Sequence, residues 1–320
     1  MRAPEVWTKD DGLGALLAPL GAVHALAVAA RIRFARPWRA PVPVFCAGNL
    51  TLGGAGKTPT VAALVAELAA RGRRPAILTR GYGGTERGPL RVDPASHDAA
   101  RVGDEPLLLA ELAAVHVGAD RVAGARQAIA DGADVLVMDD GFQNPGLAKD
   151  CALVVIDGAA GFGNGYVFPA GPLREPVASG AARAKACVVI GEDRFAAGAA
   201  TGLPVLRADL VAEPSDLAGA RVLAFAGIGR PSKFFDTLKS VGAEIAATRE
   251  FADHHPYSAA EIEALHAEAA RLGARLATTR KDLVRLPAAA RHGIAALGVT
   301  LRFADPAAFA KLVDTGLARC

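Results

Sequence analysis

One glycine-rich segment has the residue types and spacing needed to bind a chain of phosphates: Thr51-Leu52-Gly53-Gly54-Ala55-Gly56-Lys57-Thr58. It lies between an apolar run that predicts a strand (41–49) and a segment with helical spacing (60–72). The backbone N–H groups of such a loop and the N-terminus of the following helix form a nest for anions. We expect all eight residues to bind a nucleotide, with Lys57 neutralising the β- and γ-phosphates and the Thr58 hydroxyl holding Mg²⁺. Thr51 stands where the usual pattern has its first glycine, so the match depends on its strand–loop–helix context.

Two acidic residues, Asp139 and Asp140, lie at the end of another apolar run (135–141), just before its final glycine. A buried strand that ends in a carboxylate is typical of the Mg²⁺-binding half of a phosphate-loop site. Two adjacent acids repel each other unless a cation or hydrogen-bond donors lie beside them. We therefore expect Asp139 to complete the Mg²⁺ shell at the carboxyl edge of a sheet.

The nucleotide is predicted to be ATP. GTP-binding proteins read guanine with an Asn/Thr-Lys-x-Asp motif, whereas the nearest segment here, Thr279-Arg280-Lys281-Asp282, places lysine directly before aspartate. Regulatory ATPases of the membrane-partitioning type have an additional lysine near the start of the loop, and residues 49–56 contain none. Both observations favour an ATP-dependent enzyme.

The elements that must position these residues follow an α/β pattern. Strand-like apolar runs (75–80, 115–120, 135–141, 152–158 and 186–192) alternate with helical segments (105–114 and 121–132). Near-continuous apolar strands that alternate with helices predict a parallel sheet covered on both faces. The fold class that follows is a P-loop NTPase-like parallel sheet domain with a second, smaller α/β domain.

The second domain is predicted from a new alternation of strands and helices after a loosely composed stretch (193–220). Strands are expected at 221–229, 275–279 and 294–303, and helices at 232–242 and 258–272, before a closing helix. We assign residues 1–40 to an N-terminal segment, 41–205 to the P-loop domain and 206–320 to the second domain. The sequence leaves open whether the closing helix packs on its own domain or on the first.

Composition excludes some function classes. The 320 residues are 52% hydrophobic and 22% charged, as in a globular protein of about two domains. The net charge of +3 is too balanced for a protein that coats nucleic acid. None of the four cysteines forms a Cys-x-x-Cys pair, so we expect buried thiols at Cys46, Cys151 and Cys187, and Cys320 is the last residue.

The N-terminal segment contains nineteen residues without formal charge (12–30), followed by Arg31, Arg33, Arg36 and Arg39. Pro19 and His24 interrupt it, which weakens the alternative of a spanning helix. A second alternative is a core helix packed on the sheet. We favour an interfacial helix whose apolar stripe enters the inner leaflet while the arginines meet anionic headgroups. The expected stripe consists of Leu13, Leu16, Leu17, Leu20, Val23 and Ala27.

An ordered series of short motifs runs from Asn49 to Asp282. It consists of Asn49–Pro59, Arg80-Gly81-Tyr82-Gly83-Gly84, Val102-Gly103-Asp104-Glu105-Pro106, Asp139-Asp140-Gly141-Phe142-Gln143, Gly163-Asn164-Gly165, Pro169–Pro176, Gly227-Ile228-Gly229, Asp253-His254-His255 and Lys281-Asp282. This series resembles the tetraacyldisaccharide 4′-kinase family of lipid A biosynthesis, and the correspondence to that family extends from about residue 12 to about residue 303. The resemblance implies transfer of the γ-phosphate of ATP to the 4′-hydroxyl of tetraacyldisaccharide 1-phosphate. It also implies Mg²⁺ as cofactor and an acylated lipid substrate in the inner membrane.

The resemblance also implies roles for individual residues. Asp104 is expected to accept the proton of the sugar hydroxyl, helped by a histidine from the second domain, either His254 or His255, with His254 ranked slightly ahead. Glu105 is expected to support Mg²⁺ with Asp139 and Thr58. Candidate substrate-side residues are Arg80, Asp140, Gln143, Arg174 and Glu175.

Alternatives to the leading interpretation remain open at this level. Arg80 could be a surface residue of a structural turn, and Gln143 a turn-stabilising amide. Asp282 could cap a short helix that starts near Lys281, or this pair could contact the nucleotide or the other domain. The chain as a whole could be a membrane-associated ATPase switch that phosphorylates no small molecule. We expect attachment to the cytoplasmic face of the inner membrane, with no obligate protein partner.

Overall fold

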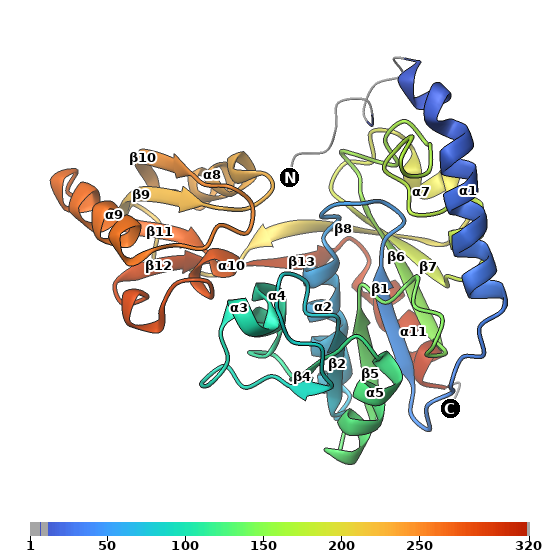
Figure 1. Ribbon diagram of the computed structural model, residues 1–320. Coiled ribbons are helices and arrows are strands. Elements are labelled where there is room, and N and C mark those ends of the chain that lie inside the picture. The colour runs from blue at the N-terminus through green and yellow to red at the C-terminus, as the bar shows by residue number, and fades with distance from the viewer. Residues whose placement is uncertain (1–6, 8–11, 319–320) are drawn as a thin grey trace.

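The computed structural model describes residue 7 and residues 12–318, which form two sheets with helices around them (Figure 1). Expectations that concern residues 1–6, 8–11 and 319–320, Cys320 included, lie outside the described residues. The larger sheet carries the phosphate loop. Its strands are β1 Val44–Gly48, β2 Pro75–Thr79, β3 Leu90–Arg91, β4 Ala114–Val117, β5 Val135–Asp139, β6 Cys151–Asp157, β7 Ala186–Ile190, β8 Val205–Ala212 and β13 Val299–Phe303.

The larger sheet is parallel in its centre and antiparallel at both edges. Its strand order is β13-β8-β7-β6-β1-β5-β2-β4-β3. β3 pairs antiparallel with β4, and β13 pairs antiparallel with β8, whereas the pairs between β8 and β4 are parallel. The expected parallel sheet is therefore a mixed sheet with a parallel core. Because β5, β1 and β2 are neighbours, the segments that follow them meet at one edge.

Helices cover both faces of this sheet. α2 (Lys57–Ala70) and α11 (Pro306–Leu317) pack on one face, and α5 (Arg121–Ala130) and α7 (Ala197–Ala200) on the other. The remaining helices of this part are α1 Leu13–Arg33, α3 Ala99–Val102, α4 Asp104–Leu109 and α6 Val177–Ala181.

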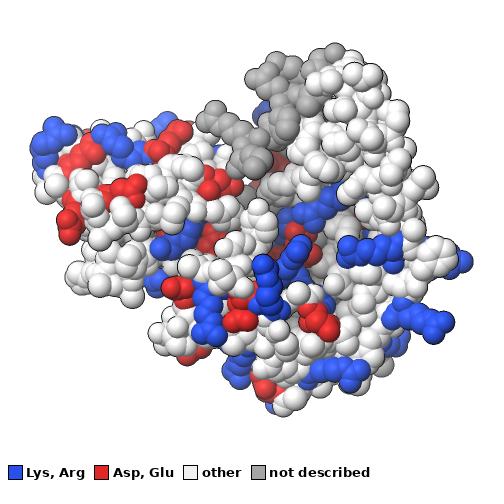
Figure 2. Space-filling model, viewed as in Figure 1, with Lys and Arg blue, Asp and Glu red and all other residues white. Residues whose placement is uncertain are grey.

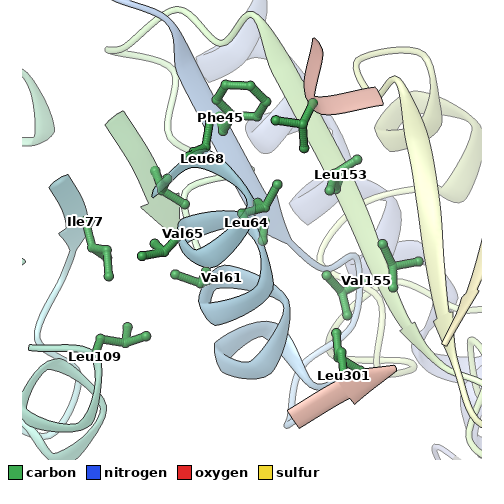
Figure 3. Packing of buried hydrophobic residues seen from close by; sticks show 14 of the residues in the cluster. Phe45, Val61, Leu64, Val65, Leu68, Ile77, Leu109, Leu153, Val155 and Leu301 are labelled. Atoms are coloured by element: carbon green, nitrogen blue, oxygen red, sulfur yellow. The ribbon is translucent and has the colours of Figure 1, made fainter. Parts of the chain in front are cut away.

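The first turn of α2 is held in place by a buried apolar stripe. Val61, Leu64, Val65 and Leu68 recur at helical spacing and pack against Phe45 and its neighbours (Figure 3). Burying four such side chains contributes on the order of 6–10 kcal/mol of transfer free energy. This packing fixes the start of α2, and with it Lys57, relative to β1.

The smaller sheet has four parallel strands in the order β10-β9-β11-β12. Two clusters, one around Phe234 and Leu238 and one around Tyr257, Ile262 and Leu265, bury its two faces. We call this sheet with its helices the smaller lobe, and the larger sheet with its helices the larger lobe. The elements of the smaller lobe are β9 Arg221–Ala226, α8 Pro231–Ser240, β10 Glu244–Glu250, α9 Ala259–Arg271, β11 Arg275–Thr279, α10 Arg280–Leu283, η2 Ala288–Ala290 and β12 Ile294–Leu297.

The chain returns to the larger lobe at its end. The sequence analysis assigned residues 206–320 to the second domain, whereas β8 and β13 both lie in the larger sheet. α11 packs back on α2, where Arg71 forms an ion pair with Asp314 (2.6 Å). A second difference concerns the helix expected at 105–114, which ends as α4 at Leu109 before β4 begins at Ala114.

α1 lies along the outside of the larger lobe and not on the sheet (Figure 1). Its small residues Gly14 and Gly21 allow close approach to the segment 164–170, since a Cβ on Gly21 would lie 2.6 Å from the Val167 carbonyl oxygen. The outward face carries exposed apolar side chains, among them Leu16, which is 74% exposed, and Phe34, 82%. The core-helix alternative is therefore wrong. Leu17 of the expected stripe is half-buried, while Leu26 joins the exposed face.

Candidate active site

The phosphate loop connects β1 to α2. Gly56 is the N-cap of α2 with φ +88°, and a Cβ at this position would lie 2.4 Å from Cδ1 of Ile190. The positive φ therefore favours glycine there, while the close contact is with the end of a side chain that can shift. Gly53 (φ +111°) and Gly54 face open space, so the backbone is accessible to a ligand. Lys57, whose side chain is only 12% exposed, holds its Nζ 3.5 Å from the Gly53 carbonyl oxygen, over the loop.

The start of the phosphate loop pairs with the proline- and glycine-rich segment Pro169–Pro176. Thr51 forms an antiparallel bridge with Leu173, Leu52 N–H donates to the Pro172 carbonyl (2.7 Å), and Arg174 N–H donates to the Leu50 carbonyl (2.7 Å). Because Thr51 sits in a strand-like bridge, it does not need the conformational freedom of a glycine. This pairing explains how the loop tolerates the departure from the usual pattern.

A charged network lies beside the loop. Asp140, with φ +50°, accepts two hydrogen bonds from the Arg174 guanidinium (2.8 and 3.0 Å) and lies 3.8 Å from Lys57 Nζ. Burial raises the pKa of Asp140, but the charges of Lys57 and Arg174 outweigh it, so the net shift is downward. Asp140 is therefore a carboxylate that holds two cations at the mouth of the loop.

Gln143 and Glu175 support this network from behind. Gln143 donates to the Asn49 carbonyl oxygen and to Glu175 (both 3.0 Å) and accepts from Arg174 (3.2 Å). Glu175, with its side chain 2% exposed, also pairs with Arg183 (2.7 Å). The carboxylate of Glu175, expected on the substrate side, is enclosed by protein groups in this structure. Gln143 likewise braces the loop.

Asp139 is buried at the end of β5 without a partner for one oxygen. Its Oδ1 is inaccessible and accepts no hydrogen bond from any described residue. Burial raises the pKa of Asp139 to about 7, and the nearby Glu105 charge adds to this while Lys57 opposes it. An uncompensated buried carboxylate beside a second acid fits a hard divalent cation, which takes oxygen ligands and keeps several waters.

The donor set beside Asp139 is sparse. Within the described ranges no three His, Cys, Asp or Glu side chains converge as a complete metal site. Thr58, in the first turn of α2, and Glu105, in the first turn of α4, are the other candidate ligands. Such a set fits Mg²⁺, which is commonly bound by one or two carboxylates together with nucleotide phosphates.

This burial predicts a pH-dependent stability for the protein without metal and nucleotide. Between about pH 4 and pH 7 folded Asp139 holds a proton that the unfolded chain has released, so stability falls as pH rises. We expect Asp139→Asn to unfold less readily than the original chain, with an advantage that grows by on the order of 2 kcal/mol from about pH 5 to about pH 8. Urea denaturation at both pH values measures the free energy of unfolding of each protein. If this free energy changed with pH in the same way in both proteins, the prediction would be contradicted.

Asp104 lies at the N-terminus of α4 and meets the smaller lobe. It is 3% exposed, and its Oδ2 lies 2.9 Å from Nδ1 of His254 and 3.1 Å from Nε of Arg285. Lys281 Nζ is 3.9 Å from the same oxygen. Burial raises the pKa of Asp104, but the His254 hydrogen bond and the charges of Lys281, His254 and Arg285 together lower it. Asp104 is therefore ionised at neutral pH, and cationic groups of the smaller lobe enclose it.

The tertiary structure separates the two histidines. His254 adopts φ +59°, and its N–H donates to the Gly227 carbonyl (3.1 Å), which turns its ring toward Asp104. His255 points back into the smaller lobe, where Nε2 lies 2.9 Å from Glu261. The alternative of His255 as partner of Asp104 is corrected, because its ring is held by its own lobe.

Lys281 and Asp282 have different positions. Lys281 Nζ reaches across to Glu105 (3.3 Å), so this residue contacts the larger lobe. Asp282 is fully buried and does not cap α10, because Thr279 is the N-cap and accepts from Asp282 N–H (2.9 Å). Its carboxylate instead accepts from Gly227 N–H, Tyr257 Oη and Thr279 Oγ1.

We predict that replacing Asp282 strongly destabilises the smaller lobe. Asp282→Ala removes the acceptor of three hydrogen bonds and leaves Arg285, 3.2 Å away, without this partner. We expect the free energy of unfolding of the smaller lobe to fall by roughly 3–5 kcal/mol. Hydrogen exchange of β9 and β11 measures this loss. Glu263→Ala, an exposed acid on α9, is the control, and an equally small loss in both variants would contradict the prediction.

Two arginines at the site had no role in the sequence analysis. Arg285, with its side chain 5% exposed, follows Asp282 by one helical turn and also donates to the Gly227 carbonyl (2.9 Å). Arg121, at the start of α5, is 6% exposed; burial lowers its pKa, while the charges of Asp139 and Asp140 oppose that shift. Spacing from neighbouring motifs could have suggested Arg285, but only the sheet order brings Arg121 near Asp139. Arg80 is exposed and makes no hydrogen bond or ion pair to a described residue.

A phosphate loop between β1 and α2, with a buried carboxylate at the end of the adjacent parallel strand, defines a P-loop nucleotide-binding protein. A family profile described as tetraacyldisaccharide-1-P 4′-kinase matches residues 13–318. The chain belongs to this family.

Individual relatives are similar over nearly their whole length. The tetraacyldisaccharide 4′-kinase of Gluconacetobacter diazotrophicus is 58% identical, with 99% of this chain and 98% of the relative covered. That of Rhodospirillum centenum is 55% identical, with 96% and 94% covered. The crystal structure of the "apo" form of LpxK from Aquifex aeolicus in complex with ATP superposes with a TM-score of 0.77 at 27% identity, covering 95% of this chain and 99% of that one. The fold and the family agree with the expectations from sequence.

Proposed function

We propose that this protein transfers the γ-phosphate of ATP to the 4′-hydroxyl of tetraacyldisaccharide 1-phosphate, forming lipid IVA in lipid A biosynthesis. The observation that carries this proposal is the contact between Asp104 of the larger lobe and His254 of the smaller lobe. This contact supports a proton acceptor at Asp104, which directly precedes Glu105, the acid whose charge acts on Asp139, in a chain of this family. A nucleotide switch needs no such acceptor.

The phosphate loop supplies the charge that the transfer requires. Its open backbone and the N-terminus of α2 cradle the phosphates, and Lys57 approaches the β- and γ-oxygens. Asp140 and Arg174 keep Lys57 in place over the loop. In phosphoryl transfer little covalent chemistry falls to the protein, so positioning and charge stabilisation supply most of the rate.

Mg²⁺ is proposed as the metal, held by Thr58, Glu105 and Asp139. When bound it would neutralise charge on the phosphates. The unpartnered Oδ1 of Asp139 supports this assignment. Glu105 is held near it by Lys281 of the smaller lobe, so closure of the two lobes and assembly of this acidic pair are linked.

Asp104 is proposed to accept the proton of the sugar hydroxyl. A carboxylate with a lowered pKa is a weak base, but the loose transition state of phosphoryl transfer needs the proton removed only as the new O–P bond forms. His254 orients Asp104 through the 2.9 Å contact. Because groups of the smaller lobe enclose Asp104, we propose that the smaller lobe moves aside to admit the hydroxyl and closes again.

The substrate is proposed to lie on the side of Arg80 and the Asp140–Arg174 pair. Arg80 is free to meet the 1-phosphate, and Arg174 presents a guanidinium next to the loop. Gln143 and Glu175 act there through their hydrogen bonds to Arg174 and its neighbours.

We propose peripheral attachment to the cytoplasmic face of the inner membrane. By length and composition α1 could cross a membrane: its 18-residue apolar window has a mean hydropathy of 1.9, and 11% of that window is buried. However, Gly14, Gly21 and His24 contact the segment 164–170 of the same lobe over three turns. A helix docked along its length is suited to lie in the interface with Leu16, Leu20 and Leu26 in the acyl region.

The proposal is tested by incubating the protein with γ-labelled ATP, Mg²⁺ and tetraacyldisaccharide 1-phosphate in detergent. The expected product is a doubly phosphorylated lipid. ATP hydrolysis without labelled lipid would support the alternative, a membrane-associated ATPase switch, and would overturn the kinase assignment.

A further inference from the structure

A basic hollow lies at the edge of the larger sheet opposite the phosphate loop. Arg39, Lys149, Asp150 and Lys185 line an open surface hollow of about 580 Å³. Asp150 and Lys185 immediately precede β6 and β7, and Arg39 lies five positions before β1, so the hollow opens at the amino ends of the parallel strands. The nucleotide site lies at the carboxyl ends, and the proposed reaction therefore does not use this hollow.

The hollow carries an excess of positive charge. Three cations and one anion leave a net charge of +2, and the anion is already satisfied. Asp150, with its side chain 7% exposed, pairs with Arg39 (2.8 Å) and accepts from Val44 N–H (2.9 Å). An anionic ligand would therefore meet cations with little competition from Asp150.

The two lysines have donors available. Lys149 Nζ donates to the carbonyl oxygens of Asn144 (2.6 Å) and Leu147 (3.3 Å), which leaves one of its three N–H groups. Burial lowers the pKa of Lys149, and an anion bound beside it would oppose that shift by stabilising the ammonium. Lys185 is exposed and makes no hydrogen bond or ion pair with any residue that the structure describes.

The chain leads from the C-terminal end of α1 to the hollow, because Arg39 follows the last residue of the helix by six positions. The segment after α1 is fixed by Trp38 N–H to the Gly146 carbonyl (2.8 Å) and Ala148 N–H to the Trp38 carbonyl (2.9 Å), which places Arg39 beside Lys149. Figure 2 shows a surface without charged residues along α1 and basic side chains gathered near its C-terminal end. A bilayer that accepts Leu26 and Phe34 would bring its headgroups to this end.

We propose that this hollow binds the phosphate of an anionic phospholipid headgroup. The inference rests on the peripheral attachment proposed above and deepens it, because it names the lipid chemistry that would fix the protein's orientation. The apolar face of α1 would insert into the bilayer, and Lys149 and Lys185 would donate hydrogen bonds to the headgroup phosphate.

Co-sedimentation with vesicles tests the proposal, using phosphatidylcholine alone and phosphatidylcholine mixed with phosphatidylglycerol. We expect Lys185→Gln to weaken binding to the mixed vesicles by about five-fold and Lys149→Gln/Lys185→Gln by roughly twenty-fold, with little change on phosphatidylcholine. Lys239→Gln is the matched control: it removes an exposed lysine on α8 of the smaller lobe, outside the lining and away from α1. An equal loss in Lys239→Gln and Lys185→Gln would show diffuse surface attraction and overturn the headgroup site.

Calorimetry with a soluble short-chain phosphatidylglycerol and with inorganic phosphate separates the possible ligands. Binding of the lipid that is lost in the double variant supports the proposal, whereas equal binding of inorganic phosphate would overturn a lipid-specific site. Lipid phosphorylation in detergent should be unchanged in Lys185→Gln. If the original chain bound the vesicles as expected but phosphorylated no lipid, the proposed function would fail while the headgroup site stood.

Discussion

Asp104→Asn is expected to lower kcat for lipid phosphorylation by about 10²–10⁴-fold, the usual contribution of a positioned proton acceptor. The asparagine keeps the shape of the side chain and one oxygen that can accept from Arg285, but it cannot take a proton. ATP binding should change little, because Asp104 contacts His254, Arg285 and Lys281 and not the phosphate loop. Steady-state kinetics with detergent-dispersed lipid, together with nucleotide titration, measure both quantities.

The matched variants for this prediction are His254→Ala and His255→Ala. The first removes the partner of Asp104, and we expect a smaller loss in kcat with unchanged ATP binding. The second removes a ring bound to Glu261 within the smaller lobe, and we expect kcat within a few-fold of the original. Thermal unfolding of Asp104→Asn serves as the folding control. A fully folded Asp104→Asn that retained more than about a tenth of the activity would refute the assignment of the base.

Lys57→Ala is expected to lower kcat/KM by roughly 10²–10³-fold, because one preorganised cation at the transferring phosphoryl group is lost. The side chain of Lys57 is held over the loop by Gly53 and Asp140, so its position needs no reorganisation when nucleotide binds. Loss of Lys57 also leaves Asp140 with Arg174 alone, which adds negative charge near the phosphates. ATP binding should therefore weaken as well.

Kinetics at varied ATP concentration measure this effect. Lys57→Arg keeps the charge but replaces a compact ammonium by a planar fork, and we expect activity between that of Lys57→Ala and the original. Lys239→Gln, an exposed lysine of α8 paired with Asp236, controls for charge alone. Equal kcat/KM in Lys57→Ala and Lys239→Gln would contradict the proposed nucleotide site.

Local sequence determined the elements of the nucleotide site. The apolar runs at β1 and β5, the glycines at 53, 54 and 56 and the helical stripe of α2 each act within a few residues, so their pattern predicts strand, loop and helix directly. Parallel strands also have an inherent direction, and this places Asp139 at the same edge as Lys57.

The tertiary structure decided the pairings that join distant segments. β8 alternates exposed and buried residues near the sheet edge, so its composition does not resemble a core strand, and its place depends on β13 from the other end of the chain. The choice of His254 over His255 depends on a positive φ and a hydrogen bond to Gly227, neither of which two adjacent histidines can specify. Tertiary contacts also decide the roles of Arg285, Arg121 and the enclosed Glu175. Their roles come from burial and from charges contributed by residues tens of positions away, and sequence spacing alone does not contain that information.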